Sequence, residues 1–408
     1  MAKGEKCSFC GRGENEVRLL MPGRDGCICD ECAEQAYLLS EEYLHKKKKA
    51  SSKWTVSRED LPKPEEIKTF LDQYVIGQDD AKRYLSVSVY NHYKRVLQVA
   101  DNDDVEIEKS NIIMVGPTGT GKTLLAKTIA RLLKVPFTIV DATVLTEAGY
   151  VGEDIESILT RLLQVADYDV EAAERGIVFI DEIDKIARKS DNPSITRDVS
   201  GEGVQQGLLK LLEGSIVNVP PQGGRKHPEQ KMIPVNTKNI LYICGGAFDG
   251  IERKIAMRLN THVVGYNGGG SNGRIDRENL LQYIAPQDLK SFGLIPEIIG
   301  RLPILTYLQP LDKAALRRIL VEPQNSIIKQ YIKLFEMDGV KLSFDEDMLD
   351  YVVEKAVEFK LGARGLRSIV ETIMMDAMYE TPSSTKKKLH ITRSYAEKKL
   401  EKAKLLAV

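Results

Sequence analysis

The chain has 408 residues, and its 58 basic and 59 acidic side chains nearly cancel to a formal net charge of -1. This length is too great for one ordinary hydrophobic core, so we expect two or three domains. The balanced charge gives no electrostatic footprint of a dedicated nucleic-acid-binding protein, although a local basic patch is compatible with it.

The first residues and the hydropathy pattern predict neither a signal peptide nor a membrane span. The first residues, MAKGEKCSFC, are polar and lack the apolar core of a signal peptide. No run approaches the roughly 18 apolar residues of a membrane span. We therefore expect a soluble, cytoplasmic protein with no membrane partner. In that compartment cysteines are expected as metal ligands or buried thiols rather than as disulfides.

Four cysteines in the N-terminal segment follow the pattern C-x2-C-x18-C-x2-C: Cys7, Cys10, Cys29 and Cys32. Each C-x2-C pair can direct two thiolates at one ion, and two pairs complete a tetrahedral zinc site. A domain over residues 1–48 cannot bury much of a core, so zinc binding, worth roughly 10–16 kcal/mol in small modules, would supply the folding energy. Cys27 could compete as a ligand, but the spacing to Cys32 favours Cys29.

Composition divides the rest of the chain into three parts. Residues 49–61 are basic, contain Ser and Pro, and lack periodicity, which is typical of a linker, although the lysine run could contact nucleic acid. Residues 62–311 alternate apolar strands with helical segments, which predicts an α/β domain with a mainly parallel sheet covered by helices. Residues 312–408 predict a smaller, mainly helical domain with strand candidates in VKLSF and KLHIT.

A strand-loop-helix pattern predicts a nucleotide site. The strand NIIMV leads into GPTGTGKT, which is followed by the helical LLAKTIARLL. Glycines in such a loop let backbone N–H groups surround phosphates at the positive end of a helix, Lys122 bridges the β- and γ-phosphates, and Thr123 ligates Mg²⁺. The residues that we assign to the nucleotide here are Gly116, Pro117, Thr118, Gly119, Thr120, Gly121, Lys122, Thr123 and Leu124.

The apolar strand GIVFIDEID ends in acidic residues. Asp181 is expected to hold the Mg²⁺ shell, and Glu182 to orient and deprotonate the attacking water, so we predict ATP hydrolysis and not only binding. The alternative is a pair of surface acids after a buried strand. Asp184 and Lys185 are adequately explained by a salt-bridged turn.

The strand in NILYICGGAF should lie next to these residues, near the γ-phosphate. ATPases of this type often end this strand with a polar Asn or Thr that senses the nucleotide. Here Cys244, Gly245 and Gly246 occupy that end, so we assign no sensor residue.

Two arginines and one tyrosine have two interpretations each. Arg301 in IPEIIGRLP and Arg364 in LGARGLRSIVE could neutralise charge on a transferring phosphoryl group, but alone each is explained by a structural ion pair. Tyr150 and Val151 lie between two glycines in TEAGYVGED, which indicates a mobile loop. The simpler interpretation of Tyr150 is a turn whose ring packs on the core.

The motifs occur in one order: the four-cysteine segment, GPTGTGKT, GYVGED, IDEIDKI, RDVSGEGVQQ, RKHP, FGLIPEIIGRLP and GARGLRSIVE. In this order, over nearly the whole chain, the sequence closely resembles the ClpX family of AAA+ unfoldases, which feed the ClpP peptidase. The phosphate loop alone is generic, but the full set with the zinc module is highly specific.

The resemblance implies a homohexameric ring with ATP bound between subunits. Arg301 would be the finger supplied to a neighbouring subunit, and Arg364 would report the nucleotide state from the small domain. Val75 and Ile76 in YVIGQ match the segment that packs on the adenine. Partners would be a ClpP-type peptidase, unfolded or tagged protein substrates and adaptors, with dimerisation or adaptor binding through the zinc module.

The resemblance also implies roles for four loops. Tyr150 and Val151 match a first pore loop that grips unfolded polypeptide, and Arg197 and Asp198 fall in a second pore loop. A basic loop at the channel entrance would attract acidic or carboxylate-bearing substrate ends, and comprises Arg225, Lys226 and His227. The peptidase-docking tripeptide is Val264, Gly265 and Tyr266, where the family usually has Ile-Gly-Phe or Leu-Gly-Phe.

Two other functions compete with an ATP-driven unfoldase and translocase. One is a nucleic-acid remodelling ATPase, such as a helicase or loader, with the zinc module and the lysine-rich linker as DNA contacts; the near-neutral charge and Tyr150 argue against it. The other is a binding adaptor in which the zinc module is the main functional unit and the ATPase only controls assembly.

Overall fold

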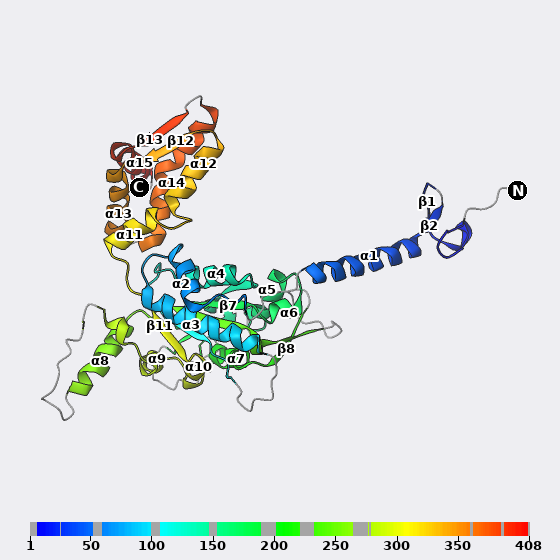
Figure 1. Cartoon of the computed structure of the whole chain (residues 1–408), viewed down its shortest axis with the longest axis horizontal. Coiled ribbons are helices and arrows are strands. Elements are labelled where there is room, and N and C mark those ends of the chain that lie inside the picture. Colours follow the sequence, from blue (N-terminus) through cyan, green and yellow to red (C-terminus); the bar gives the residue numbers. More distant parts are fainter. Residues whose placement is uncertain are drawn as a thin grey trace. The chain divides into compact units, whose positions relative to one another are not determined.

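The structure is a computed structural model of the chain, and it describes residues 6–24, 26–51, 59–98, 107–146, 153–188, 201–220, 232–263, 276, 279–359, 362–384 and 387–406. The chain divides into two compact units, residues 1–55 and 56–408 (Figure 1). Among the described helices, none is long and apolar enough to cross a membrane. The finer boundaries expected from composition, at residues 48, 61 and 311, stay predictions.

The N-terminal unit is a small hairpin followed by one long helix. Strands β1 (Leu20–Pro22) and β2 (Cys27–Cys29) pair antiparallel, after the short 3-10 helix η1 (Glu14–Glu16). Helix α1 (Asp30–Ser51) starts directly after β2 and continues into the first residues of the predicted linker. The two acids in its first turn suit the positive end of a helix.

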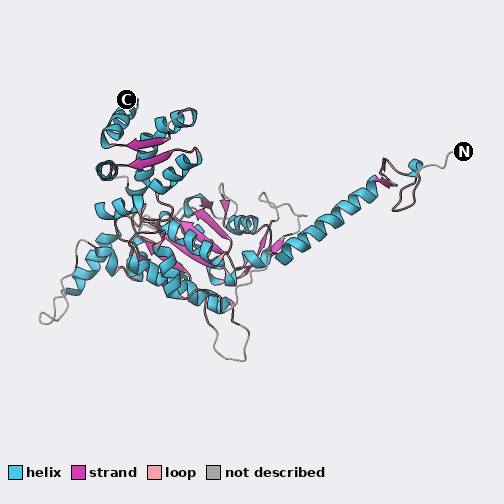
Figure 2. Cartoon of the chain, turned by 45° about the horizontal axis from the view of Figure 1, so that its top comes forward, coloured by secondary structure: helices cyan, strands magenta, loops and turns pink. Residues whose placement is uncertain are grey.

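The second unit is built around a five-stranded sheet whose order is β11-β3-β10-β7-β4. Every neighbouring pair in it is parallel, so each connection crosses over. Its central strands are continuous apolar runs because both faces are covered, and Figure 2 shows them among helices. The predicted parallel α/β domain is thus confirmed. The strands are β3 (Ile112–Val115), β4 (Phe137–Asp141), β7 (Ile177–Asp181), β10 (Leu241–Gly246) and β11 (Ile304–Tyr307).

Helices of this domain are α2 (Pro64–Asp72), α3 (Asp79–Val96), α4 (Lys122–Leu133), α5 (Ser157–Val165), α6 (Val170–Ala173), α7 (Glu202–Glu213), α8 (Ile251–Val263), α9 (Pro286–Phe292) and α10 (Pro296–Arg301). Short 3-10 helices are η2 (Ala142–Val144), η3 (Ile183–Ile186), η4 (Thr237–Asn239) and η5 (Leu280–Tyr283). Two ribbons lie outside the main sheet. One pairs β5 (Leu145–Thr146) with β6 (Glu153–Asp154), and the other pairs β8 (Ile216–Val219) with β9 (Ile233–Asn236).

The C-terminal part of this unit has a hydrophobic core of its own, formed largely by its helices. Both strand candidates exist, and β12 (Lys341–Phe344) pairs in parallel with β13 (Lys388–Ile391). Side-chain caps start two of its helices, because Asp312 and Ser326 accept hydrogen bonds from backbone N–H groups in the first turn. Its helices are α11 (Lys313–Val321), α12 (Ile327–Met337), α13 (Glu346–Glu358), α14 (Gly362–Glu380) and α15 (Arg393–Leu406), with η6 (Thr381–Ser383).

Candidate nucleotide and metal sites

The phosphate loop connects β3 to α4, as the sequence predicts. Gly119 and Gly121 have φ angles of 85° and 103°, in the left-handed region that strains other residues. Helix α4 begins at Lys122, directly after this turn, so the free N–H groups of its first turn are at the loop. The loop therefore combines the backbone donors and the helix dipole that bind an anion.

Gly116 is required by packing rather than by its backbone angles. A Cβ atom on Gly116 would lie 2.7 Å from the carbonyl oxygen and 2.9 Å from the Cβ of Leu308. The N–H group of Gly116 donates to the carbonyl of Gly246, at 3.1 Å, which joins the loop to the end of β10. The first residue of the loop is thus fixed between two neighbouring strands.

Lys122 is folded back on the loop. Its side chain is 7% exposed, and Nζ donates to the carbonyl oxygens of Gly116 (2.5 Å) and Pro117 (3.0 Å). Burial lowers the pKa of Lys122, and the nearby carboxylates of Asp181 and Asp184 oppose that effect. Since two carbonyl groups are weak partners for an ammonium group, phosphate oxygens can replace them with a gain in electrostatic energy.

Thr123 and Asp181 meet at the end of β7. The hydroxyl of Thr123 donates to Oδ2 of Asp181 at 3.3 Å, while Oδ1 of Asp181 accepts the N–H of Glu182 at 3.0 Å. Two oxygen atoms next to the phosphate loop are the kind of ligand that Mg²⁺ prefers, so these residues fit that ion. Glu182 is exposed and has a left-handed backbone with φ 56°, an uncommon conformation that concentrates at functional sites.

The end of β10 explains why the sequence offers no polar sensor there. A Cβ on Gly245 would lie 2.7 Å from Cζ of Phe179, and one on Gly246 would lie 2.7 Å from Oδ1 of Asp184. Cys244 is fully buried, and this burial raises its pKa to about 12. The end of β10 therefore presents only backbone atoms to Asp181, because there is no room for a side chain at Gly245 or Gly246.

Asp184 does more than form the expected turn. It pairs with Lys185 at 3.4 Å, in agreement with a salt-bridged turn, and its Oδ1 also accepts the N–H of Ala247 at 3.1 Å. This buried carboxylate joins the acidic segment after β7 to the segment after β10.

Arg301 forms an ion pair within the chain, since its Nη2 lies 3.0 Å from Oε1 of Glu213. Its side chain is nevertheless about half exposed. Arg364 lies near the start of α14, and its positive charge contributes to the lowered pKa of Lys122. The backbone N of Ala363 is 3.7 Å from the position that a Cβ on Gly119 would take. The first turn of α14 therefore lies beside the phosphate loop.

Val75 and Ile76 are buried, at 5% and 6% exposure. The position of a Cβ on Gly121 is 3.6 Å from Cγ1 of Val75, so this side chain lies against the phosphate loop. Leu124, by contrast, is 46% exposed on α4. The structure thus brings the predicted adenine segment, the phosphate loop and the acidic end of β7 together.

Lys82 supports the segment that contains Val75 and Ile76, and no sequence motif indicated this role. The residue is 2% exposed, and its Nζ donates to the carbonyl of Val75 (2.7 Å) and to Oδ1 of Asp72 (2.6 Å). A fully buried lysine is rare unless it is paired. The available signal was its place on the inner face of the helix that follows YVIGQ, in register with Leu85 and Val89.

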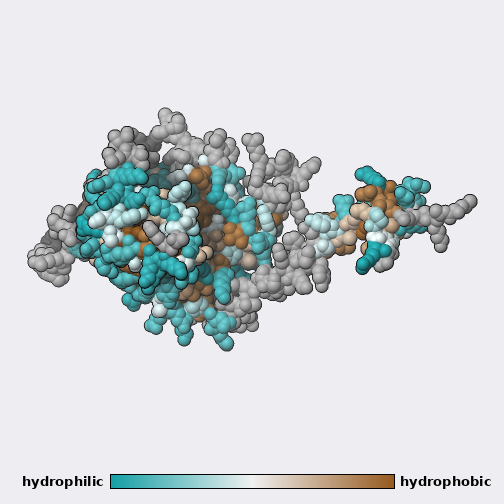
Figure 3. Space-filling model, turned by 90° about the horizontal axis from the view of Figure 1, so that it is seen from above, coloured by the Kyte–Doolittle hydropathy of each residue, from teal (hydrophilic) through white to brown (hydrophobic). Residues whose placement is uncertain are grey.

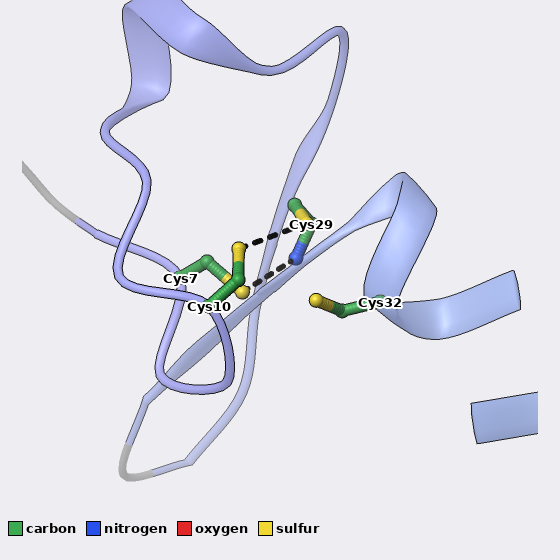
Figure 4. A group of neighbouring side chains, drawn as sticks. All are labelled: Cys7, Cys10, Cys29 and Cys32. Atoms are coloured by element: carbon green, nitrogen blue, oxygen red, sulfur yellow. Dashed lines mark hydrogen bonds between the residues drawn. The ribbon is translucent and has the colours of Figure 1, made fainter. Parts of the chain in front are cut away.

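The four cysteines of the predicted zinc site come together (Figure 4). One Sγ atom from each of Cys7, Cys10, Cys29 and Cys32 lies within 4.8 Å of all the others. The Sγ atoms of Cys10 and Cys29 are 3.7 Å apart, close to the edge of about 3.8 Å that a tetrahedron with Zn–S bonds of about 2.3 Å would have. Cys27 is outside the group, and its N–H donates to Oγ of Ser8.

Local hydrogen bonds prepare one of these thiols for metal binding. The N–H of Cys29 donates to Sγ of Cys7 at 3.3 Å. Hydrogen bonds from the backbone of Cys10 and, more weakly, of Cys29 lower the pKa of Cys7 against the opposing effect of burial. Since the thiolate is the metal-binding form, this favours coordination by Cys7. The hydrogen bond with Cys29, together with burial, instead raises the pKa of Cys32 to about 12, so the metal must displace the proton of that thiol.

The structure does not test the four predicted loops. Their residues lie outside the described parts of the chain: Tyr150, Val151, Arg197, Asp198, Arg225, Lys226, His227, Val264, Gly265 and Tyr266.

Three family models match the chain. Residues 5–42 match the ClpX C4-type zinc finger, residues 107–305 match the AAA domain of the Cdc48 subfamily, and residues 311–392 match the C-terminal D2-small domain of ClpB protein. Together they follow the order of zinc module, ATPase domain and small helical domain.

Full-length relatives give the same result. The chain is 75% identical over 401 residues to the ATP-dependent Clp protease ATP-binding subunit ClpX of Bacteroides thetaiotaomicron, with 98% of this chain and 97% of the relative covered. Identity and coverage are the same for the protein of that name from Bacteroides fragilis. For that from Porphyromonas gingivalis, the identity is 74% over 393 residues, with 96% and 95% covered.

Proposed function

The chain belongs to the ClpX family, and from this premise we propose that it unfolds protein substrates by ATP hydrolysis and threads them into a ClpP-type peptidase. Membership makes it an AAA+ ATPase subunit and not itself the protease. The observation that carries the proposal is the contact of Thr123 with Asp181 beside a complete phosphate loop, in a chain that matches a member of this family over 98% of its length.

The residues at the phosphate loop have distinct roles in hydrolysis. Lys122 leaves the carbonyl groups of Gly116 and Pro117 and binds the β- and γ-phosphates. Thr123 and Asp181 hold Mg²⁺, which when bound neutralises charge on the phosphate oxygens. Glu182 accepts the proton of the attacking water from an exposed position next to Asp181.

Two arginines extend the site beyond one large domain. In a homohexamer, Arg301 gives up its ion pair with Glu213 and contacts the γ-phosphate of the ATP that is bound to a neighbouring subunit. There it stabilises the charge of the transition state. Arg364 approaches the phosphate loop from the first turn of α14 and reports the nucleotide state to the small domain. Val75 and Ile76 pack on the adenine.

The loops act on the substrate and the peptidase. Tyr150 and Val151 grip the polypeptide in the pore, and Arg197 and Asp198 contribute to a second pore loop. A basic loop at the channel entrance attracts acidic or carboxylate-bearing substrate ends. Val264, Gly265 and Tyr266 dock on the peptidase. The entrance residues are Arg225, Lys226 and His227.

The zinc module binds partners. Its four cysteines hold Zn²⁺, and the match to a C4-type zinc finger supports that ion. Figure 3 shows apolar residues on the surface of this unit, where Phe9 is 72% and Leu19 is 57% exposed. Exposed apolar side chains suit dimerisation or the binding of adaptors and substrates in the cytoplasm.

Replacing Tyr150 with alanine separates the unfoldase from a nucleic-acid remodelling ATPase. We expect Tyr150→Ala to hydrolyse ATP but to unfold a tagged fluorescent protein at least about tenfold more slowly, because the pore loop loses the aromatic ring that contacts the polypeptide. Unfolding at the wild-type rate, together with loss of DNA-stimulated hydrolysis, would contradict the proposal.

Deleting residues 1–60 tests the alternative in which the zinc module is the main functional unit. We expect the shortened chain to retain ATP hydrolysis and to lose only some substrates.

A further inference from the structure

Residues 73–78, between α2 and α3, contact the phosphate loop on one side and the small domain on the other. Val75 lies against Gly121, as described above, and Lys82 holds the carbonyl of Val75 from α3. The segment is therefore rigidly placed beside the nucleotide site. Its glutamines, Gln73 and Gln78, make further contacts with distant parts of the chain.

Gln78 binds the backbone of one residue that is 231 positions away. Its Nε2 donates to the carbonyl of Gln309 at 2.9 Å, and its Oε1 accepts the N–H of Gln309 at 2.8 Å. Gln78 is 8% exposed and has a left-handed backbone with φ 62°. A buried carboxamide that satisfies both backbone groups of one residue fixes that residue in position and orientation.

Gln309 is placed where the large domain ends. The preceding residue, Leu308, donates its N–H to the carbonyl of Val115 at 2.7 Å and packs on Gly116. Only residues 310–312 separate Gln309 from α11 of the small domain. Gln309 thus begins the connection between the large domain and the small domain.

A second contact joins the same segment directly to the small domain. The N–H of Gln324 donates to the carbonyl of Gln73 at 2.8 Å, and Nε2 of Gln324 donates to Oε1 of Gln73 at 2.9 Å. The hydroxyl of Tyr74 donates to Oε1 of Gln324 at 2.6 Å. These side chains are exposed, whereas the Gln78 contact is part-buried. Water replaces an exposed hydrogen bond more easily, so each of the two part-buried bonds of Gln78 constrains its partner more than each exposed bond of Gln324.

We propose that Gln78 is a positioning residue that fixes the start of the interdomain connection, so that nucleotide contacts at Val75 reach the small domain through Gln309. Without its side chain, the segment beside the phosphate loop and the connection can move independently. ATP hydrolysis would continue, but the small domain would take less defined positions in each nucleotide state. More ATP would then be hydrolysed for each substrate molecule that is unfolded. This inference rests on the proposed unfoldase function.

The test replaces Gln78 with methionine, which keeps the length of the side chain but forms neither hydrogen bond with Gln309. The control is Gln330→Met, which makes the same replacement and removes an exposed glutamine-to-carbonyl hydrogen bond, to Asn325 within the small domain. The first measurement is the number of ATP molecules hydrolysed per molecule of tagged protein unfolded by the full chain. We expect a rise of about threefold or more for Gln78→Met, because both part-buried hydrogen bonds to Gln309 are lost, and no change for the control.

The second measurement is the distance between domains, from spin labels at the exposed positions Tyr84 and Val357, with labelled subunits diluted in unlabelled chain. The wild type should give distinct distances with ADP and with a non-hydrolysable ATP analogue, and Gln78→Met should give broad, overlapping ones. If Gln78→Met does not fold, Gln78→Glu replaces it: this variant keeps an acceptor for the N–H of Gln309 but loses the donor to its carbonyl, so a smaller rise in the ATP cost is expected.

Two results would overturn the inference: a wild-type ATP cost in Gln78→Met, or wild-type distances in both nucleotide states. A lower melting temperature with an unchanged ATP cost would likewise mean that the contact is merely structural. Failure of the proposed function is distinguishable, because there the wild type itself would hydrolyse ATP without unfolding the substrate. The interdomain distances would still decide the role of Gln78.

Discussion

The packing at the end of β10 predicts that even alanine is costly at Gly245. Its Cβ would lie 2.7 Å from Cζ and 3.2 Å from Cε2 of Phe179, and both residues are buried. Either the ring or the strand must move, and overpacking of this kind typically costs about 1–3 kcal/mol. In a domain of this size about 1 kcal/mol lowers the melting temperature by about 2–4 °C, so we expect a decrease of roughly 2–12 °C.

The assay is thermal unfolding of the full chain, followed by circular dichroism, for Gly245→Ala, Phe179→Leu and the double variant. Leucine removes the ring atoms that the new Cβ would meet, so the double variant should be more stable than the sum of the single effects by about 1 kcal/mol or more. Additive effects, or a Gly245→Ala variant with the melting temperature of the wild type, would refute the packing argument. The end of β10 would then have room for a sensor side chain.

Three further predictions concern catalysis, zinc and pH. Glu182→Gln should bind ATP yet hydrolyse it at least about 100-fold more slowly, because the general base is lost; fast turnover in a phosphate-release assay would exclude this role. A chelator that removes Zn²⁺ should unfold the N-terminal module, as seen by protease digestion of residues 6–51, while ATP hydrolysis by the remaining domains persists; a protease-resistant module without zinc would contradict the metal site. Burial, reinforced by the charge of Arg95, lowers the pKa of His92 to about 3, whereas the unfolded imidazole titrates near 6.5. The unfolded chain therefore binds the additional proton below about pH 6.5, and the neutral ring contributes stability that is lost as the pH falls, by about 2 kcal/mol between pH 7 and pH 5. His92→Gln should consequently show a smaller drop in melting temperature over that range, and equal drops would disprove a buried neutral His92.

Local patterns predicted the parts of the site that are local in structure. The left-handed Gly119 and Gly121, the helix that starts at Lys122, and the acids that end β7 all follow from short motifs, because their geometry depends on neighbouring residues. The four-cysteine site was predicted for the same reason, since each C-x2-C pair is a local turn around one ion. A parallel sheet followed from apolar strands separated by helices.

Contacts between distant residues could not be predicted from the sequence. Nothing local in VIGQ indicates that Gln78 binds Gln309, because that pairing depends on how the sheet ends beside the segment. The role of Lys82 likewise requires the positions of Asp72 and Val75 together. The missing sensor has a steric cause, the ring of Phe179 from the neighbouring strand, which only the strand order reveals.

The most direct test of the unfoldase function is degradation of a stably folded, tagged protein by the chain and a cognate ClpP-type peptidase. We expect degradation only when the chain, the peptidase and ATP are all present, and none with Glu182→Gln in place of the wild type. ATP hydrolysis by the wild type without any unfolding or degradation of the tagged protein would contradict the proposed function.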